Sequence, residues 1–169
     1  MKKLMMALIG LALMICMVIS AGAEEYGAAW TGFTTVDMEG NPVDDSIFAQ
    51  ADLTVLNIWG TYCSPCVSEM PELAAWANEL PENVQLLGLV VDSGSVTDIP
   101  HDMAAKILES SGATFTNLLY NESLEPQLSE IDGTPTTLFL DSQGNQVHAP
   151  ILFASVELYK LSVQDCLAQ

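Results

Sequence analysis

The stretch Leu53-Thr-Val-Leu-Asn-Ile-Trp-Gly-Thr-Tyr-Cys-Ser-Pro-Cys66 decides the fold. Its first seven residues form an apolar, β-branched run without a breaker, which predicts a buried central strand. Two cysteines separated by two residues follow that strand. From Pro65 to Leu80, apolar residues recur at helical spacing. We therefore expect the chain to turn sharply after the strand and to enter a helix that begins at the two cysteines.

The rest of the sequence predicts strands that alternate with helices. Turn signals at Glu39-Gly-Asn41 and Asp141-Ser-Gln-Gly-Asn145 predict β-hairpins, one of them N-terminal. Alternating strands and helices build βαβ units, and hairpins add antiparallel strands. The expected fold class is therefore α/β, with a mixed central sheet flanked by helices. We expect further strands over residues 84–91, 114–120, 136–140 and 146–152, and helices over 100–110, 123–130 and 155–167, the last two capped by Ser123 and Ser155.

The two cysteines are placed for reversible disulfide chemistry. At a helix start, Cys63 would lie near unpaired backbone N–H groups and the positive end of the helix dipole, which lower its pKa and supply thiolate. Cys66 lies one turn further in, where we expect it to be better buried. Cys63 would attack a substrate disulfide to form a mixed disulfide, and Cys66 would then attack Cys63 to release the reduced substrate. Pro65 cannot donate a backbone hydrogen bond and starts the helix rigidly.

Other roles of the cysteine pair stay open at this stage. The pair could be a permanent disulfide staple. It could also be half of a zinc site, but zinc needs about four ligands, and the chain beyond the first 23 residues adds only Cys166, His101 and His148, at no recognised spacing. We expect both histidines to be surface or turn residues and Cys166 to be a half-buried free thiol. No metal and no cofactor are expected.

The first residues have the layout of an export signal. Lys2 and Lys3 form a short positive end, an apolar run reaches Ile19, and Ala21-Gly-Ala23 supplies the small residues that a signal peptidase accepts. We expect residues 1–23 to be removed on export to the periplasm, the cell envelope or the medium. Because the apolar run is almost long enough to span a bilayer, an uncleaved membrane anchor stays open as the alternative.

Residues 24–169 suit one domain, and with half of the whole chain apolar they can bury a core. The charge is strongly negative, with 22 acidic residues against four lysines and no arginine. Loss of Lys2 and Lys3 with the export signal would take the formal net charge from -18 to about -20. Nucleic acid and anionic lipid surfaces are disfavoured as partners, because their phosphates would find no counter-charges.

At its cysteines the sequence resembles the thioredoxin superfamily, and more narrowly the exported thiol-disulfide reductases of the TlpA and ResA type. The resemblance runs from roughly Phe33 to Leu167. It is carried by Asn57-Ile-Trp-Gly-Thr-Tyr-Cys-Ser-Pro-Cys66, Glu69-Met-Pro-Glu-Leu73 and Gly133-Thr-Pro-Thr-Thr-Leu-Phe-Leu140. What it implies is a thioredoxin fold and a reaction of the cysteine pair with disulfides of other proteins.

The resemblance also implies features outside the cysteine motif. One is a family-type insertion, formed by the strand and helix around residues 114–130. Another is that Pro135 is a cis proline packed against the disulfide, with Thr134 offering backbone hydrogen bonds to an extended substrate segment. From the residues alone, the weaker statement holds that Pro135 must open its strand or lie at an edge.

Glu69 is a candidate for the proton chemistry of the thiols. It falls three residues after Cys66, on the same side of the helix. The resemblance implies that this glutamate tunes the thiols or receives a proton from them. Asn57 stands where thioredoxin has a buried carboxylate, so Glu69 is the nearby acid that we propose. The alternative is an ordinary acid in the first helical turn, favoured by the helix dipole.

The remaining site candidates surround the cysteines. Tyr62 stands where the family usually has tryptophan, and we expect it to contact substrate. Trp59 is expected to pack beneath the site, although a plain core aromatic would look the same in sequence. Ser64 and Pro65 form the spacer between the cysteines. Because a strongly oxidising centre usually has a cation or histidine in that spacer, and the spacer here has neither, we expect a reductase.

Two further functions stay open as alternatives. A peroxiredoxin-like peroxidase would need threonine or serine three residues before its reactive cysteine, where this chain has Gly60. A copper-binding module could use Cys63, Cys66 and His148, because thiolates suit soft metals. The spacing of the cysteines and the helix start favour the thiol-disulfide oxidoreductase.

The expected partners are disulfide-containing exported proteins, for example apocytochrome c or an oxidised methionine sulfoxide reductase. An exported reductase must be re-reduced because its surroundings keep oxidising it. The resemblance implies a membrane electron donor of the CcdA or DsbD type. We expect the protein to be a monomer.

Overall fold

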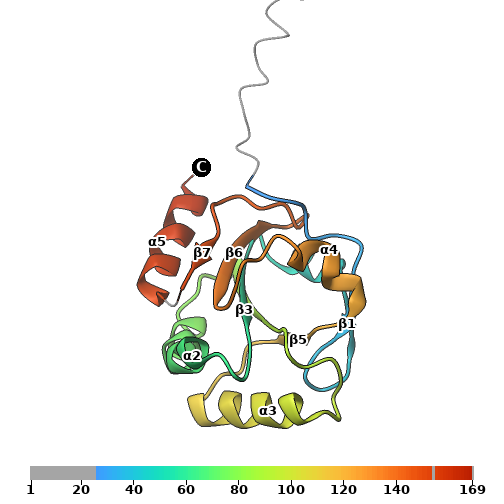
Figure 1. Cartoon of the computed structure of the whole chain (residues 1–169). Coiled ribbons are helices and arrows are strands. Elements are labelled where there is room, and N and C mark those ends of the chain that lie inside the picture. The colour runs from blue at the N-terminus through green and yellow to red at the C-terminus, as the bar shows by residue number, and fades with distance from the viewer. Residues whose placement is uncertain (1–25, 154, 169) are drawn as a thin grey trace, which may run out of the picture.

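The strand β3 (Leu53–Trp59) lies at the centre of the main sheet, and all of its residues are buried. The computed structural model describes residues 26–153 and 155–168, in which this sheet has the strand order β5-β4-β3-β6-β7. β4 (Val84–Val90) runs parallel to β3, and β6 (Thr136–Asp141) runs antiparallel to it on the other side. The sheet is therefore mixed, as predicted (Figure 1).

The edges of the sheet are short strands. β5 (Asn117–Leu119) pairs in parallel with β4, and β7 (Ile151–Leu152) pairs antiparallel with β6. The expected strand over 146–152 forms only at its two ends, with an isolated bridge between Leu140 and Gln146 and then β7. Pro150 lies between them and lacks the backbone donor that a continuous ladder needs.

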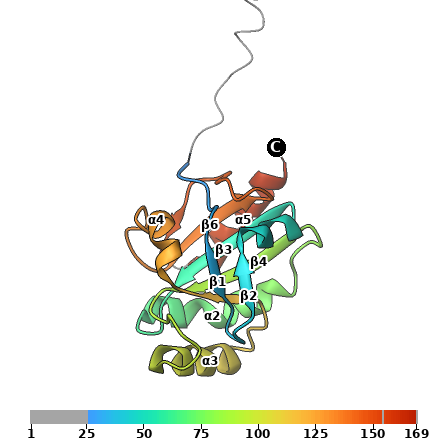
Figure 2. The ribbon, with the colours of Figure 1, turned by 90° about the vertical axis from the view of Figure 1, so that its right-hand side faces the viewer.

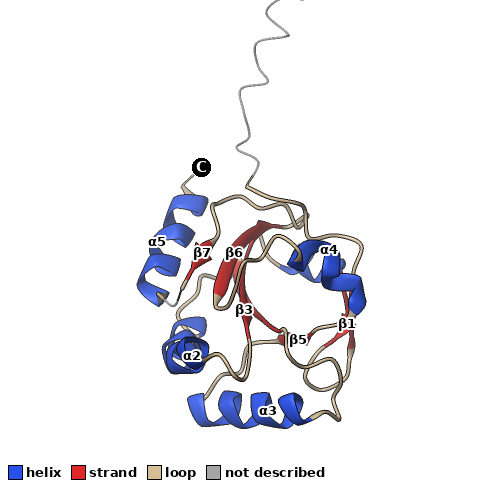
Figure 3. Cartoon of the chain, in the orientation of Figure 1, coloured by secondary structure: helices blue, strands red, loops and turns tan. Residues whose placement is uncertain are grey.

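Helices and loops cover both faces of this sheet (Figures 1 and 3). The helices α2 (Ser64–Ala77), α3 (Ile99–Ser111) and α5 (Val156–Leu167) contribute to the core on one face. The other face is covered by the N-terminal segment and by the short helices η1 (Asp45–Gln50), η2 (Glu122–Leu124) and α4 (Glu125–Leu128).

The alternation of side chains along β3 divides the core into two layers. Val55 and Trp59 pack with α2 and α5, whereas Leu56 and Ile58 pack with the residues that cover the opposite face. Asn57 falls on the same side of the strand as Val55 and Trp59. It is the polar position in an otherwise apolar stripe, and it faces the helix that carries the cysteines.

The predicted N-terminal hairpin is present as β1 (Thr34–Val36) and β2 (Pro42–Asp44), which pair antiparallel (Figure 2). The Asp37 carboxylate closes the turn by accepting hydrogen bonds from the backbone N–H groups of Glu39 and Asn41. Gly40 has φ +84°, a left-handed conformation that glycine adopts without steric cost.

Local capping explains where several helices begin and end. Asp98 caps α3 by accepting from the His101 N–H, and Gly112 ends that helix in the left-handed region. Ser155 caps α5 as predicted. The expected cap at Ser123 is wrong, because the Asn121 side chain accepts from the Ser123 N–H and starts the turn two residues earlier.

The expected export signal, residues 1–23, lies outside the described residues. Within the described residues, every helix falls short of the length and apolarity that a membrane-spanning segment requires.

Candidate active site

The two cysteines lie where β3 passes into α2. Cys63 occupies the N-cap position of α2, and its Sγ accepts a hydrogen bond from the Cys66 N–H at 3.3 Å. The two residues form a disulfide with a Cα–Cα distance of 5.3 Å. Cys63 is partly exposed and Cys66 is fully buried, as the sequence predicted. The outer sulfur can therefore be reached by a second protein, whereas the inner one is shielded.

The turn that carries Cys63 is held by Asp92, which sequence reasoning did not select. One carboxylate oxygen of Asp92 accepts from the Thr61 N–H at 2.8 Å, from the Thr61 hydroxyl at 2.9 Å and from the Tyr62 N–H at 3.4 Å. A Cβ on Gly60 would lie 3.2 Å from the same oxygen, so glycine permits this close approach. Asp92 follows β4 at the same edge of the sheet as Cys63, which is the signal that could have pointed to it.

A cis peptide bond joins Thr134 and Pro135, as the family resemblance implied. Pro135 is buried directly before β6, and Thr134 is half-buried. The Pro135 carbonyl accepts from the Phe153 N–H at 3.0 Å, which ties the segment after β7 to the proline.

A buried hydrogen-bond network surrounds Glu69. Asn57 Nδ2 donates to Glu69 Oε1 and to Thr137 Oγ1, both at 3.0 Å. The Tyr159 hydroxyl contacts Glu69 Oε2 at 3.1 Å. These residues come from β3, β6, α2 and α5, and Glu69 is only 6% exposed. An acid on the first turns of a surface helix has thus been enclosed between that helix and the sheet.

The protonation of this network follows from its burial. Desolvation raises the pKa of Glu69 above the ordinary value of 4.5, against the lowering effect of the hydrogen bonds from Asn57 and Tyr159, and the charge of Glu72 raises it further. Burial, together with the Glu69 charge, raises the pKa of Tyr159 to about 12. The Tyr159 hydroxyl therefore keeps its proton at neutral pH, while Glu69 is an acid that can exchange one.

Tyr159 is the second residue that sequence reasoning missed. It is fully buried, and its ring contacts that of Trp76 on α2 at a centroid distance of 6.4 Å. In the sequence it is one of several apolar positions of an amphipathic helix, so no local signal separates it from ordinary core residues.

The other predicted site residues lie around the disulfide. Trp59 is buried in the same core cluster as Cys66, and its Nε1 donates to Asn117 Oδ1 at 2.8 Å. Tyr62 is 72% exposed, and Ser64 and Pro65 are exposed at the start of α2. Trp59 thus packs beneath the site, and the exposed Tyr62 side chain can contact another molecule.

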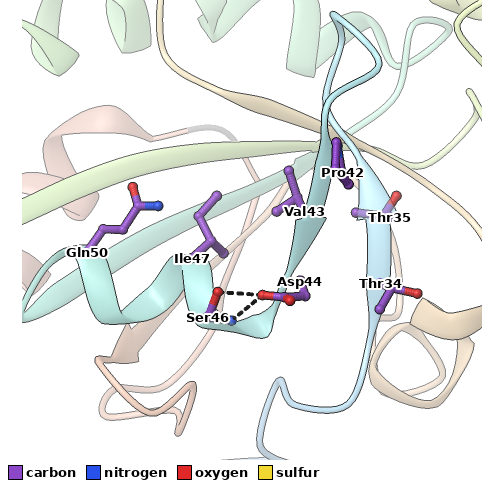
Figure 4. A pocket seen from close by; sticks show the side chains of 8 residues that line it. All are labelled: Thr34, Thr35, Pro42, Val43, Asp44, Ser46, Ile47 and Gln50. Atoms are coloured by element: carbon purple, nitrogen blue, oxygen red, sulfur yellow. Dashed lines mark hydrogen bonds between the residues drawn. The ribbon is translucent and has the colours of Figure 1, made fainter.

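Two cavities lie on different parts of the surface. A cavity of about 180 Å³ borders Thr134 and is lined mostly by apolar side chains: Ile58, Val91, Tyr120, Leu128, Ile131, Gly133 and Thr134. A cavity of about 360 Å³ lies over β1, β2 and η1, where the Asp44 carboxylate accepts from Ser46 (Figure 4). The second cavity is lined only by residues between Thr34 and Gln50, so it lies apart from the disulfide and the cis proline.

Among the described residues, no three His, Cys, Asp or Glu side chains lie together in a group that could hold a metal ion. His148 packs against the ring of Phe139 at 5.1 Å. His101 is half-buried, and its Nε2 lies 2.9 Å from the Met38 carbonyl, so it joins α3 to the hairpin turn. Cys166 is a half-buried free thiol, and burial raises its pKa to about 11.

Comparison with protein families gives a match of residues 26–148 to the AhpC/TSA family. The thiol-disulfide oxidoreductase ResA of Geobacillus thermodenitrificans is 32% identical over 89 residues, which are 53% of this chain and 48% of that protein. The chain thus spans about half the length of the curated relatives it matches. The match agrees with the ResA-type resemblance expected from the sequence.

Solved structures share the architecture at low sequence identity. The thioredoxin domain of a thiol-disulfide oxidoreductase from Bacteroides vulgatus has a TM-score of 0.65 at 21% identity, covering 83% of this chain and 97% of that one. A secreted Mycobacterium tuberculosis disulfide oxidoreductase homologous to E. coli DsbE has a TM-score of 0.59 at 22% identity, covering 81% and 96%. These likenesses show that the chain has the thioredoxin fold.

The burial of Glu69 predicts a pH-dependent stability. Because its pKa is raised in the folded state, stability is greatest where the carboxyl is protonated in both states, and it falls as pH rises through the folded pKa. Glu69→Gln removes this ionisation. We expect the free energy of unfolding of the variant, relative to the wild type, to increase as pH rises from about 4 to about 8, measured by urea denaturation with the disulfide intact.

Glu72→Gln is the matched control, because Glu72 is exposed on the same helix. Its stability difference from the wild type should change less with pH. A Glu69→Gln difference that stays constant over this range, or moves the other way, would contradict the assignment of a costly buried charge to Glu69.

Proposed function

The chain belongs to the AhpC/TSA family, and we propose that it works there as an exported thiol-disulfide oxidoreductase that reduces disulfides in other extracytoplasmic proteins. The observation that carries the proposal is the Cys63–Cys66 disulfide at the start of α2, with its outer sulfur partly exposed and its inner sulfur buried. Such a pair can alternate between dithiol and disulfide, while a second protein reaches only Cys63.

The reaction begins at Cys63 in the reduced protein. Its position at the N-cap of α2, with the Cys66 N–H directed at its sulfur, stabilises a thiolate. That thiolate attacks one sulfur of a substrate disulfide, so that a Cys63–substrate disulfide forms and the other substrate sulfur leaves as a thiolate. The buried Cys66 is one helical turn away and is shielded from the substrate.

Cys66 completes the reaction once it has lost its proton. We assign Glu69 as the acceptor of that proton, because it lies one turn after Cys66 and burial brings its pKa up towards that of a thiol. The Cys66 thiolate then attacks Cys63, the internal disulfide forms, and the second substrate thiolate leaves. Two electrons pass from the dithiol to the substrate, and the departing thiolates take up protons.

Charge supports the reductive direction. A strongly oxidising centre needs a stabilised thiolate, usually with help from a cation or histidine between its cysteines. Here the spacer is Ser64-Pro65, the chain has no arginine, and in the described residues Lys106 and Lys160 lie on α3 and α5. Acidic surroundings disfavour thiolates and so favour the oxidised form of the pair.

The substrate is proposed to lie along the rim formed by Tyr62 and the cis-proline segment. Tyr62 projects beside Cys63, and the backbone of Thr134 would hydrogen-bond an extended substrate segment, as the family resemblance implies. The apolar cavity that borders Thr134 would accept a small apolar side chain next to the substrate cysteine.

The biological setting is proposed from the sequence and the relatives. The predicted export signal, residues 1–23, and the secreted M. tuberculosis structure of the same fold support a place outside the cytoplasm, either free or anchored by that segment. Substrates would be exported proteins, for example in cytochrome c maturation or in the repair of oxidised proteins. A membrane donor of the CcdA or DsbD type would restore the dithiol, and the protein would act as a monomer.

Insulin reduction tests the activity directly. The wild type should accelerate the dithiothreitol-dependent precipitation of insulin, whereas Cys63→Ser and Cys66→Ser should fall to the rate of dithiothreitol alone. Cys166→Ser is the matched control, because Cys166 lies in α5 outside the redox pair, and it should retain the wild-type rate. Cys66→Ser should also trap substrates as mixed disulfides on Cys63.

Two results would contradict the proposed activity. One is undiminished turnover in the Cys63→Ser variant. The other is a wild type that does not reduce insulin but binds Cu(I) tightly through both cysteines, which would favour the copper-binding alternative.

The reduction potential tests the direction of electron flow. Equilibration with glutathione buffers should place the Cys63–Cys66 couple nearer to the thioredoxin value of about -270 mV than to the DsbA value of about -120 mV. A potential near about -120 mV would make the protein an oxidant and would contradict the reductase assignment.

The role of Glu69 is tested in the reduced protein. Glu69→Gln should shift the pH dependence of Cys66 titration, followed by NMR of its ¹³Cβ, because the proton acceptor has been replaced by a neutral amide. Glu72→Gln, at an exposed position of the same helix, should shift it less. An unchanged Cys66 profile in Glu69→Gln would leave Glu69 as an ordinary acid of the helix start.

A further inference from the structure

The Tyr159 hydroxyl lies between two competing acceptors. Its oxygen is 3.1 Å from Glu69 Oε2 and 3.2 Å from the Phe153 carbonyl oxygen. The Ser155 N–H donates to the same hydroxyl at 3.3 Å. A tyrosine hydroxyl has one proton to donate, so it cannot serve the carboxylate and the carbonyl at the same time.

The protonation of Glu69 decides which acceptor receives that proton. When Glu69 is ionised, the Tyr159 hydroxyl donates to the carboxylate, because charge-assisted hydrogen bonds are the stronger ones. When Glu69 is protonated, its O–H can donate to the Tyr159 oxygen instead, and the Tyr159 proton is free for the Phe153 carbonyl. The second arrangement satisfies all three groups.

Phe153 is held in an unusual conformation beside the cis proline. Its φ is +74°, the sole positive φ outside glycine among residues 26–153 and 155–168. For an aromatic residue the left-handed region is sterically disfavoured, so neighbouring contacts must maintain it. Those contacts are the hydrogen bonds of its N–H to the Pro135 carbonyl and of its carbonyl to Tyr159.

The side chain of Phe153 is presented to the outside. It is 75% exposed, although its backbone is tied to Pro135, which borders the substrate-facing loop. An exposed aromatic ring that is held by a strained backbone at this place is suited to contact an apolar side chain of a bound protein.

We propose that Tyr159 is a positioning residue that couples the proton on Glu69 to the substrate-facing segment at Phe153. Protonation of Glu69 turns the Tyr159 hydroxyl towards the Phe153 carbonyl and secures the left-handed turn. Deprotonation of Glu69 withdraws that hydrogen bond and loosens the turn.

The groups that face Glu69 are consistent with this coupling. Glu72 on α2 and Tyr159 on α5 are the titratable neighbours that act on it electrostatically, and Cys66 precedes it on α2. From the sheet it meets the neutral Asn57, whose Nδ2 also donates to Thr137. Thr137 also faces Tyr159, where its hydrogen bond acts against the burial that raises the Tyr159 pKa.

The role of this coupling in catalysis rests on the proposed reductase function. Glu69 gains a proton when Cys66 becomes a nucleophile, that is, while a substrate is attached to Cys63. The Phe153 turn would then be firmest while the mixed disulfide is being resolved, and it would loosen when Glu69 releases its proton.

NMR titration of the disulfide form tests the coupling without any substrate. In the wild type, the Glu69 ¹³Cδ signal and the Phe153 amide signal should titrate with the same midpoint. In Tyr159→Phe, which keeps the ring, Glu69 should still titrate while the Phe153 amide no longer follows it. In Glu69→Gln, the Phe153 amide should stay at the value that the wild type reaches at low pH, because the glutamine amide donates to Tyr159 permanently.

Tyr120→Phe is the matched control. It also removes a tyrosine hydroxyl that contacts a carboxylate, that of Glu125 at 2.9 Å, and it should leave the Phe153 titration as in the wild type. If Tyr159→Phe fails to fold, the position of the Phe153 amide signal in Glu69→Gln tests the coupling by itself.

Two outcomes would overturn the proposal. A Phe153 amide that does not titrate in the wild type would mean that the Glu69 proton is accommodated at Oε1, on the Asn57 side. A Phe153 amide that still follows Glu69 in Tyr159→Phe would mean that the charge acts through space. Neither outcome bears on insulin reduction, so the reductase function and the coupling can fail independently.

Discussion

A single junction, in which a fully buried strand ends and a helix begins, places the chemistry of this protein. β3 is covered on both faces and paired on both sides, so its carboxyl end cannot move relative to the rest of the sheet. The next three residues lead to Cys63 at the N-cap of α2, and the Asp92 carboxylate at the end of the neighbouring strand holds their backbone. The reactive sulfur is therefore positioned by the centre of the fold, while it remains at the surface.

The same strand supplies the polar residue that links the cysteine helix to the sheet. Asn57 is the polar residue in the apolar stripe of β3, and its amide donates to Glu69 on α2. A buried carboxyl without a cation is costly when it is ionised, and hydrogen bonds from Asn57 and Tyr159 offset only part of that cost. Such an acid has a raised pKa, which is the property that a proton acceptor for a thiol needs.

The site has a rigid side and an adaptable side. Cys66, Trp59 and Glu69 are buried, and Trp59 and Glu69 are held by hydrogen bonds with Asn117 and Asn57, so this side of the site is fixed by the core. Tyr62 and Phe153 are exposed on segments that adjoin the disulfide and the cis proline, so the surface at this place is formed by loops. This division fits an oxidoreductase that must protect one sulfur and offer the other to proteins of differing shape.

The sequence by itself determined the strand, the turn and the helix around the cysteines, because their hydrophobic periodicity and capping are local properties. The spacing of three residues placed Glu69 on the cysteine side of that helix, whereas its candidate role in the proton chemistry came from the family resemblance. The length of the last strand was overestimated, because β7 covers only Ile151–Leu152 of the expected 146–152. Apolar alternation is visible in the sequence, whereas the missing backbone donor of Pro150 matters only once the strand pairs in a sheet. Asp92, Tyr159 and Phe153 were decided by the tertiary structure alone. Their roles come from hydrogen bonds between elements far apart in the chain, and such partners leave no pattern in the residues beside them.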